Sequence, residues 1–180
     1  MSAAIASLPA LDNDRLARLF ADNYRRVLMA AYRIAGNIAD AEDVAQGVFL
    51  RLHTGDVPAV TNAESYLYRA AINGALDLLR RRKTAGSEPL EAAASVVSAE
   101  ATSSPDVELT SLELGLQLRQ AIGELAPRAA EMFALRYLEE LGNGEIAKLM
   151  GTSQAVVAVT LYQSRSKLKK RLIELQRRMR

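Results

Sequence analysis

Apolar side chains recur at helical spacing along most of this chain, and this periodicity constrains the fold more than any other feature. Its members in the first stretch are Leu16, Leu19, Phe20, Val27, Leu28, Ala31 and Ile34. Residues at this spacing share one face of an α-helix. Ala, Leu, Arg and Glu are abundant, whereas alternating runs of β-branched residues are scarce. Because the abundant residues are good helix formers, the sequence predicts an all-α protein.

Start and stop signals divide the first half of the chain into three predicted helices. The first covers residues 13–35, and a glycine follows it as a stop signal. The second covers residues 40–53 and carries acidic side chains in its first turn, where the helix dipole favours negative charge. The third covers residues 61–83, because Thr61 and Glu64 have the spacing of a capping box.

A segment rich in Ala, Ser and Glu separates these helices from the rest of the chain. It contains prolines and carries no apolar stripe, so we expect a flexible acidic linker between two small helical domains. The predicted division is a flexible N-terminus at residues 1–11, a first domain at 12–83, the linker at 84–105 and a second domain at 106–180.

The second domain carries the pattern of a helix-turn-helix motif. Asn143 is predicted to cap a short helix that ends at Met150, Gly151 allows a tight turn, and Ser153 is predicted to cap a long final helix. Two helices joined by a turn of about three to four residues that contains Gly are typical of this motif. A plain helical hairpin is the alternative.

Charge is segregated along the chain although the net charge is only +2. Residues 80–83 form an unbroken basic run, residues 84–118 contain acidic but no basic side chains, and residues 165–180 are strongly basic. Such an alternation indicates contact with nucleic acid. Solvated helix ends are the alternative interpretation.

Motifs of catalysis and metal binding are missing from the sequence. The chain has no Cys, a single His at position 53 and no H-E-x-x-H spacing, and its one G-x-G pattern lacks the continuation of a nucleotide-binding loop. We therefore expect no enzyme, no catalytic residues, no metal and no cofactor. Without a positively charged leader or a long apolar stretch, the expectation is a cytoplasmic protein with no membrane insertion.

Three segments resemble a known family. DAEDVAQGVFLRL at residues 40–52 is similar to the polymerase-docking segment of extracytoplasmic-function (ECF) sigma factors, a subgroup of the sigma-70 family. Residues 63–83 resemble the next segment of the same domain. LAPRAAEMFALRYLEELGNGEIAKLMGTS at residues 125–153 resembles the promoter-reading helix-turn-helix domain of that family. The order and spacing of the three segments agree with this family.

The resemblance implies docking on RNA polymerase core, at the clamp of its largest subunit, through the acidic second helix. The predicted docking residues are Asp40, Glu42, Asp43 and Gln46. Asp43 and Gln46 are three positions apart and are therefore neighbours on the helix surface. Compensation of the helix dipole is the alternative role for these acids.

The resemblance also implies that the first domain contacts and melts the minus-ten promoter element. Amide, hydroxyl and carboxylate groups are available for base edges, and basic groups for phosphates. The predicted residues are Asn62, Ser65, Asn73, Asp77, Arg80, Arg81 and Lys83. Tyr66 and Tyr68 offer rings for stacking, but core packing is preferred for Tyr68.

On the final helix, one stripe is predicted to face the core and a neighbouring one the DNA. The core stripe contains Val157, Leu161, Ser164 and Leu168. The predicted contacts to the minus-thirty-five element are Ser153, Gln154, Ala155, Ala158, Tyr162, Arg165 and Lys169. Val156, Ala158, Thr160 and Gln163 depart from the Thr, Lys, Arg and Arg frequent in the family. Apolar groups can meet thymine methyls and Gln154 can bond adenine, whereas an interface with another protein is the alternative.

These expectations lead to a sigma factor that binds core RNA polymerase and directs transcription initiation by contacting the minus-ten and minus-thirty-five elements. The expected partners are polymerase core and promoter DNA, with an anti-sigma factor as a further candidate. Two alternatives stay open: a sigma-like protein that acts through protein–protein binding, and a stand-alone helix-turn-helix regulator.

Overall fold

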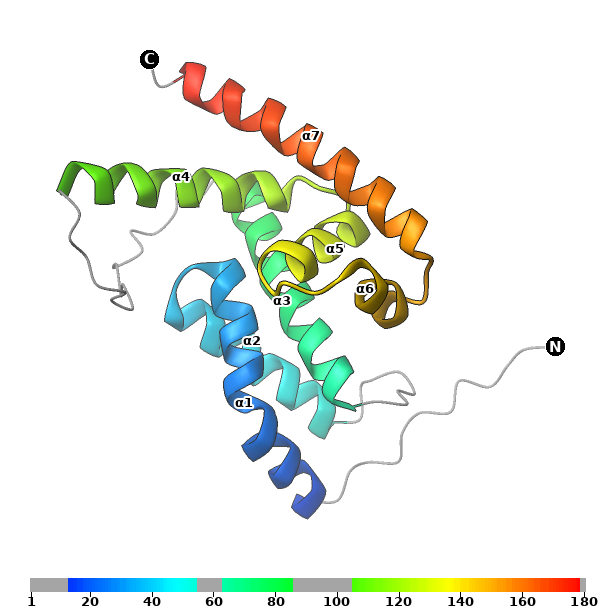
Figure 1. Cartoon of the computed structure of the whole chain (residues 1–180). Helices are drawn as coiled ribbons and strands as arrows, with labels where there is room; N and C mark the ends of the chain where they lie inside the picture. The colour runs from blue at the N-terminus through cyan, green and yellow to red at the C-terminus, as the bar shows by residue number, and fades with distance from the viewer. Residues whose placement is uncertain (1–12, 55–62, 86–104, 179–180) are drawn as a thin grey trace.

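The computed structural model describes residues 13–54, 63–85 and 105–178, and every regular element in these ranges is an α-helix (Figure 1). The predicted all-α fold is confirmed. Among the described helices, none combines the length and the apolar character that a bilayer crossing requires. The predicted N-terminal segment, residue 62 and most of the predicted linker lie outside the described residues.

Three helices form an N-terminal unit: α1 (Asn13–Ala35), α2 (Ile38–His53) and α3 (Ala63–Ala85). Their shared core comes from fully buried side chains on each helix, such as Ile34, Leu52 and Ile72. The sharp turn between α1 and α2 is made by Gly36, whose φ is +84°. This left-handed backbone favours glycine, and a Cβ there would lie only 2.6 Å from Nε of Arg119.

An aromatic cluster joins α1 to α2. The ring of Phe20 lies 4.8 Å from that of Tyr24 and 4.8 Å from that of Phe49, measured between centroids. Such spacings are favourable for aromatic pairs. Phe20 keeps 44% of its surface exposed, so its position in the apolar pattern of α1 corresponds to the rim of the core.

Four helices form a C-terminal unit: α4 (Pro105–Gly123), α5 (Pro127–Tyr137), α6 (Asn143–Met150) and α7 (Gln154–Arg178). Pro127 occupies the start of α5, where a missing N–H costs nothing. Helix α3 ends two residues later than predicted, at Ala85. Gly142, not Asn143, is the N-cap of α6, because the carboxylate of Glu145 accepts a hydrogen bond from the Gly142 N–H at 2.7 Å.

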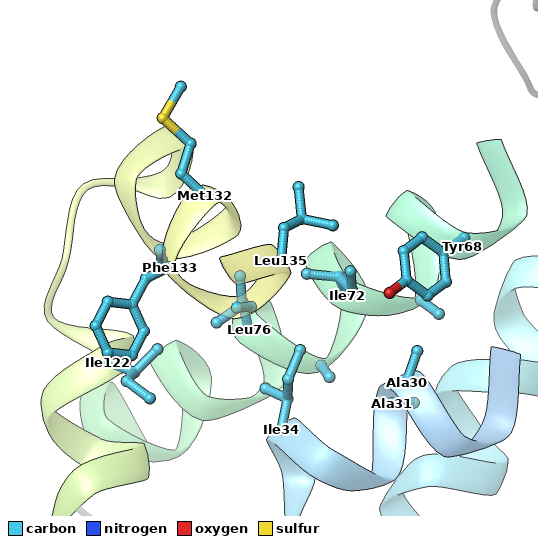
Figure 2. Close-up of a cluster of buried hydrophobic side chains, with 14 of the residues drawn as sticks. Ala30, Ala31, Ile34, Tyr68, Ile72, Leu76, Ile122, Met132, Phe133 and Leu135 are labelled. Carbon is cyan, nitrogen blue, oxygen red and sulfur yellow. The ribbon is translucent and has the colours of Figure 1, made fainter. Parts of the chain in front are cut away.

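The two units pack against each other through a continuous apolar core. Helices α4 and α5 lie beside α3, and α7 runs along the outer side of α4, α5 and α6 (Figure 1). Figure 2 shows Ile34 of α1 and Ile72 of α3 in the same cluster as Leu135 of α5. The division of the chain into domains at the predicted boundaries stays a prediction.

Candidate nucleic-acid interface

The first turn of α2 contains an acid that is committed to the fold. Asn37 caps the helix in an extended conformation, and its side-chain oxygen accepts a hydrogen bond from the Asp40 N–H at 2.9 Å. The Asp40 carboxylate in turn accepts a hydrogen bond from Nη2 of Arg82 at 2.6 Å, with only 13% of the Asp40 side chain exposed. Asp40 therefore links the start of α2 to the end of α3.

The other predicted docking residues are free to meet a partner. Glu42, Asp43 and Gln46 are all exposed. Leu50, four positions beyond Gln46, exposes 62% of its surface. Since positions three, four and seven apart share a helix face, Asp43, Gln46 and Leu50 form one exposed face, here named the α2 face. Leu50 was not among the predicted docking residues, although its spacing of four from Gln46 indicates the same helix face.

The predicted minus-ten residues are brought together in part. Asn73, Asp77 and Arg80 of α3 line a cavity of about 370 Å³. Asn73 and Asp77 are four positions apart and share one face of α3. Asp77 accepts a hydrogen bond from Nη1 of Arg80 at 2.6 Å. Ser65 is half-buried on the first turn of α3.

The basic run at the end of α3 is divided among different tasks. Arg81 is exposed, as a phosphate-binding side chain should be. Lys83 instead lies 3.1 Å from the carboxylate of Glu124, and Arg82 is paired with Asp40. The Nη2 atom of Arg80 is buried and lacks a hydrogen-bond partner among the described residues. Only part of this basic run is therefore available to bind phosphate.

The helix-turn-helix geometry is present in α6 and α7. Gly151 ends α6 in the left-handed conformation, with φ 59° and ψ 50°. The hydroxyl of Ser153 accepts a hydrogen bond from the Val156 N–H at 3.2 Å, which confirms that Ser153 caps α7. A Cβ added at Gly144 would lie 3.1 Å from the Gln154 amide nitrogen, so the two helices approach closely at this point.

The two faces of α7 are separated as predicted. Its core stripe is buried and consists of Val157, Leu161, Ser164 and Leu168. The residues predicted to meet the minus-thirty-five element are all exposed: Ser153, Gln154, Ala155, Ala158, Tyr162, Arg165 and Lys169. Apolar surface from Val156 and Val159, exposed by 47% and 56%, flanks the first part of this exposed stripe. Basic side chains occupy its second part.

Ion pairs that the sequence did not indicate connect the two units. Arg33 of α1 contacts Glu139 at 2.6 Å, and Arg69 of α3 contacts Glu131 at 2.6 Å. Tyr68, which is buried as predicted, lies beside the first of these pairs. Burial and the neighbouring Glu139 carboxylate raise the pKa of the Tyr68 hydroxyl above its usual range. Tyr68 is therefore a neutral core residue.

Comparison with known proteins identifies these units. The profile of Sigma-70 region 2 matches residues 19–85, and that of Sigma-70, region 4 matches residues 115–168. The chain belongs to the sigma-70 family. The two matches are in the expected order and together cover more than half of the chain. Within the family, its relatives place it in the ECF group.

Two relatives carry the ECF designation. The ECF RNA polymerase sigma factor SigW of Bacillus subtilis is 29% identical over 175 residues, which are 91% of this chain and 92% of SigW. The ECF RNA polymerase sigma factor SigE of Mycolicibacterium smegmatis is 31% identical over 169 residues, covering 91% of this chain and 62% of SigE. This chain thus matches SigW over nearly its whole length and SigE over somewhat less than two thirds.

A solved structure supports the fold. The sigma factor RpoE of Bartonella quintana, in complex with the anti-sigma factor NepR, superposes with a TM-score of 0.50 at 13% sequence identity. The match covers 87% of this chain and 95% of RpoE. Helical architecture is therefore shared although little sequence identity remains.

Proposed function

We propose that this ECF sigma factor docks on core RNA polymerase through the α2 face and reads promoter DNA with α3 and α7. The observation that carries the proposal is the combination of the α2 face with the exposed stripe of α7 in one chain that contains regions 2 and 4. The protein is a promoter-recognising specificity subunit of RNA polymerase, with no catalytic activity of its own. Docking on core RNA polymerase implies a cytoplasmic protein.

The α2 face supplies a mixed contact for the polymerase clamp. Asp43 offers negative charge, Gln46 offers a directional hydrogen bond and Leu50 offers an exposed apolar anchor. Charged residues steer association, and a few well-packed residues near the centre of an interface carry most of its affinity. Glu42 is exposed beside this face and adds to its negative potential. We assign Asp40 to the fold rather than to direct docking, because Arg82 engages its carboxylate.

Contacts to DNA are divided between the units. In α3, Asn73 and Asp77 are assigned to minus-ten bases and Arg81 to phosphates. In α7, Gln154 lies near the helix start, the part of a recognition helix that reads base edges. Lys169 lies further along the helix and is assigned to the phosphate backbone of the DNA. The apolar surface of Val156 and its neighbours suits thymine methyl groups.

Binding to purified core polymerase tests the docking assignment. Asp43→Lys and Leu50→Ala should each weaken binding at least about tenfold, because one introduces repulsion and the other removes an anchor. Asp22→Lys, an equal charge change at an exposed position of α1, should leave affinity unchanged. Unaltered affinity in both α2 variants would refute the docking face.

The same assay separates the alternatives. A stand-alone helix-turn-helix regulator would bind duplex DNA but not core polymerase. A sigma-like protein that acts through protein–protein binding would show no promoter-specific DNA binding in the presence of core. An anti-sigma factor, if this protein has one, would compete with core polymerase for the chain.

A further inference from the structure

The cavity between α3 and the pair of α5 and α6 is rich in arginine. It has a volume of about 370 Å³ and is lined by Arg69, Arg80 and Arg128. Two of these arginines belong to α3 and the third to the first turn of α5. The volume lies within the range of about 300–1,000 Å³ that is usual for small-molecule sites, and it is large compared with a single inorganic phosphate ion.

Positive charge exceeds negative charge in the lining of this cavity. Its two carboxylates are already paired with arginines. Asp77 contacts Arg80 at 2.6 Å, and Glu131 contacts Arg69 at 2.6 Å. Arg128 instead donates a hydrogen bond from Nη2 to the carbonyl at the end of α6, at 3.2 Å, and forms no ion pair with the described residues. Its positive charge is therefore available to an anionic ligand.

The arginines are held in place by part of their guanidinium groups and keep other N–H groups for a ligand. Arg69 donates from Nε to Glu131 and from Nη1 to the Leu149 carbonyl at 3.1 Å. Nη2 of Arg80 is buried and has no hydrogen-bond partner among the described residues. A guanidinium carries five N–H donors in a planar fork that matches a phosphate group. Because a buried donor without a partner is destabilising, a phosphate oxygen that accepts this bond would stabilise the site.

The first turn of α5 strengthens this preference for an anion. No acidic residue lies in that turn, and no side chain caps it. Its backbone N–H groups and the positive end of the helix dipole favour negative charge, and phosphate groups commonly bind at such helix starts. Pro127 and Arg128 of this turn line the cavity. The helix start therefore adds to a charge preference that the three arginines already set.

The rest of the lining suits an organic group attached to the phosphate. Pro127 and Met150 contribute apolar surface, and Asn73 contributes an amide. The Asn73 side chain is half-buried, and an amide can both donate and accept hydrogen bonds. Together with the arginines, these groups fit an organic phosphate better than they fit inorganic phosphate.

We propose that this cavity binds a small organic phosphate of the size of a nucleoside monophosphate, with its phosphate on Arg80 and Arg128 and its organic part towards Asn73. Binding is reversible and involves no covalent step. Because Asn73 and Arg80 are also assigned to minus-ten DNA, the bound molecule competes with the melted promoter strand. This competition rests on the proposed function, whereas binding of the organic phosphate does not.

Calorimetric titration of the full chain in a phosphate-free buffer tests the site. The probes are adenosine monophosphate (AMP), adenosine and inorganic phosphate. AMP should bind one molecule per chain, at least about tenfold more tightly than either other probe, since each of these lacks one part of the contacts. Absence of AMP binding to the folded protein would overturn the proposal. Equal affinity for AMP and inorganic phosphate would also overturn it, because the cavity would then select only an anion.

Two arginines of α5 provide matched variants. Arg128 and Arg136 are both exposed, and each donates one hydrogen bond to a backbone carbonyl. Arg128→Gln should weaken AMP binding at least about tenfold, because hydrogen bonds to a charged group are strong. Arg136→Gln, outside the cavity lining, should bind AMP as the wild type does.

The conservative variant Arg128→Lys keeps the charge but loses the planar fork, so its AMP affinity should lie between those of Arg128→Gln and the wild type. It also replaces Arg128→Gln in the comparison if that variant is unfolded by circular dichroism. Equal AMP affinity in the folded Arg128 variants and in Arg136→Gln would place the bound AMP outside this cavity and contradict the proposal.

Competition distinguishes this inference from the minus-ten assignment. A fluorescent pool of random single-stranded oligonucleotides is titrated onto the full chain with and without saturating AMP. AMP should weaken oligonucleotide binding severalfold. If AMP binding depends on Arg128 but leaves oligonucleotide binding unchanged, the organic-phosphate site is supported and the minus-ten assignment of Asn73 and Arg80 fails. If the oligonucleotides bind and AMP does not, the proposal fails and the minus-ten assignment stands.

Discussion

Asp40 and Asp43 show how two acids of one helix turn acquire different roles. Both were predicted to dock on polymerase, since sequence alone assigns the same charge and nearly the same position to each. Arg82 selects Asp40 as its partner at 2.6 Å, whereas Asp43 is exposed. The sequence gives no indication of this partner, because Arg82 lies 42 positions away.

Replacing each acid in turn distinguishes a role in stability from a role in docking. Asp40→Asn should lower the free energy of unfolding by about 1 kcal/mol, as expected for a partly exposed ion pair. Asp43→Asn should leave stability unchanged and weaken binding to core polymerase. Urea denaturation and a core-binding titration measure the two effects. Loss of polymerase affinity in Asp40→Asn without loss of stability would return Asp40 to the docking surface.

At the scale of elements, periodicity predicted the helices well because each buries one face. Observed ends lie within two residues of the predicted ones wherever caps such as Ser153 or breaks such as Gly151 mark them. The assignment of α7 to a buried and an exposed stripe is also confirmed. Leu50 was not predicted because an apolar residue in a helix is ordinarily expected in the core. Its spacing from Gln46 indicated the shared face, but only tertiary packing shows that this face is exposed.

Two glutamines of α7 provide a matched test of the DNA-reading stripe. Gln154→Ala should cost about 1–3 kcal/mol at one promoter position and relax the base preference there. Gln163→Ala should have no such effect, because Gln163 is also exposed but lies on the opposite side of the helix. Titration of the protein on randomised duplexes provides the measurement. Identical binding profiles for the two variants would exclude base reading by Gln154.

A phosphate contact in the same helix has a different signature. Lys169→Ala should weaken binding almost uniformly across sequences and reduce the slope of log affinity against log salt by about one unit. The titration is repeated at several salt concentrations. A sequence-dependent loss, or an unchanged slope, would place Lys169 away from the DNA backbone.

At the scale of the whole molecule, the sequence predicted two helical units but not their contact. Glu131 and Arg69 are separated by 62 positions, and Glu139 and Arg33 by 106. Hydrophobic periodicity shows which side of a helix is buried, but it does not show which element covers that side. Residues such as Asn73 were therefore expected to be open to DNA, whereas the structure places them in a cavity shared with the C-terminal unit.

The acid Glu124 makes this contact sensitive to pH. Burial acts to raise the pKa of its carboxyl, but hydrogen bonds from Lys83 and Arg171 outweigh burial and lower the pKa below the ordinary value of 4.5. The stability that this acid contributes is therefore fully present above pH 4.5 and is lost as pH falls through the lowered pKa. Glu124→Gln should weaken the acid dependence of thermal stability, whereas Glu113→Gln, exposed on α4, should preserve it. If thermal stability depends on pH in the same way in both variants, Glu124 does not stabilise the contact between the units.

Reconstituted transcription tests the sigma-factor function most directly. Purified core polymerase, genomic DNA and this protein should yield transcripts from a defined set of start sites that core alone does not produce. Asp43→Lys should abolish these transcripts while the protein stays folded, because the α2 face then repels the polymerase. Transcription that matches core alone in the presence of folded wild-type protein, or start sites unaffected by Asp43→Lys, would contradict the account.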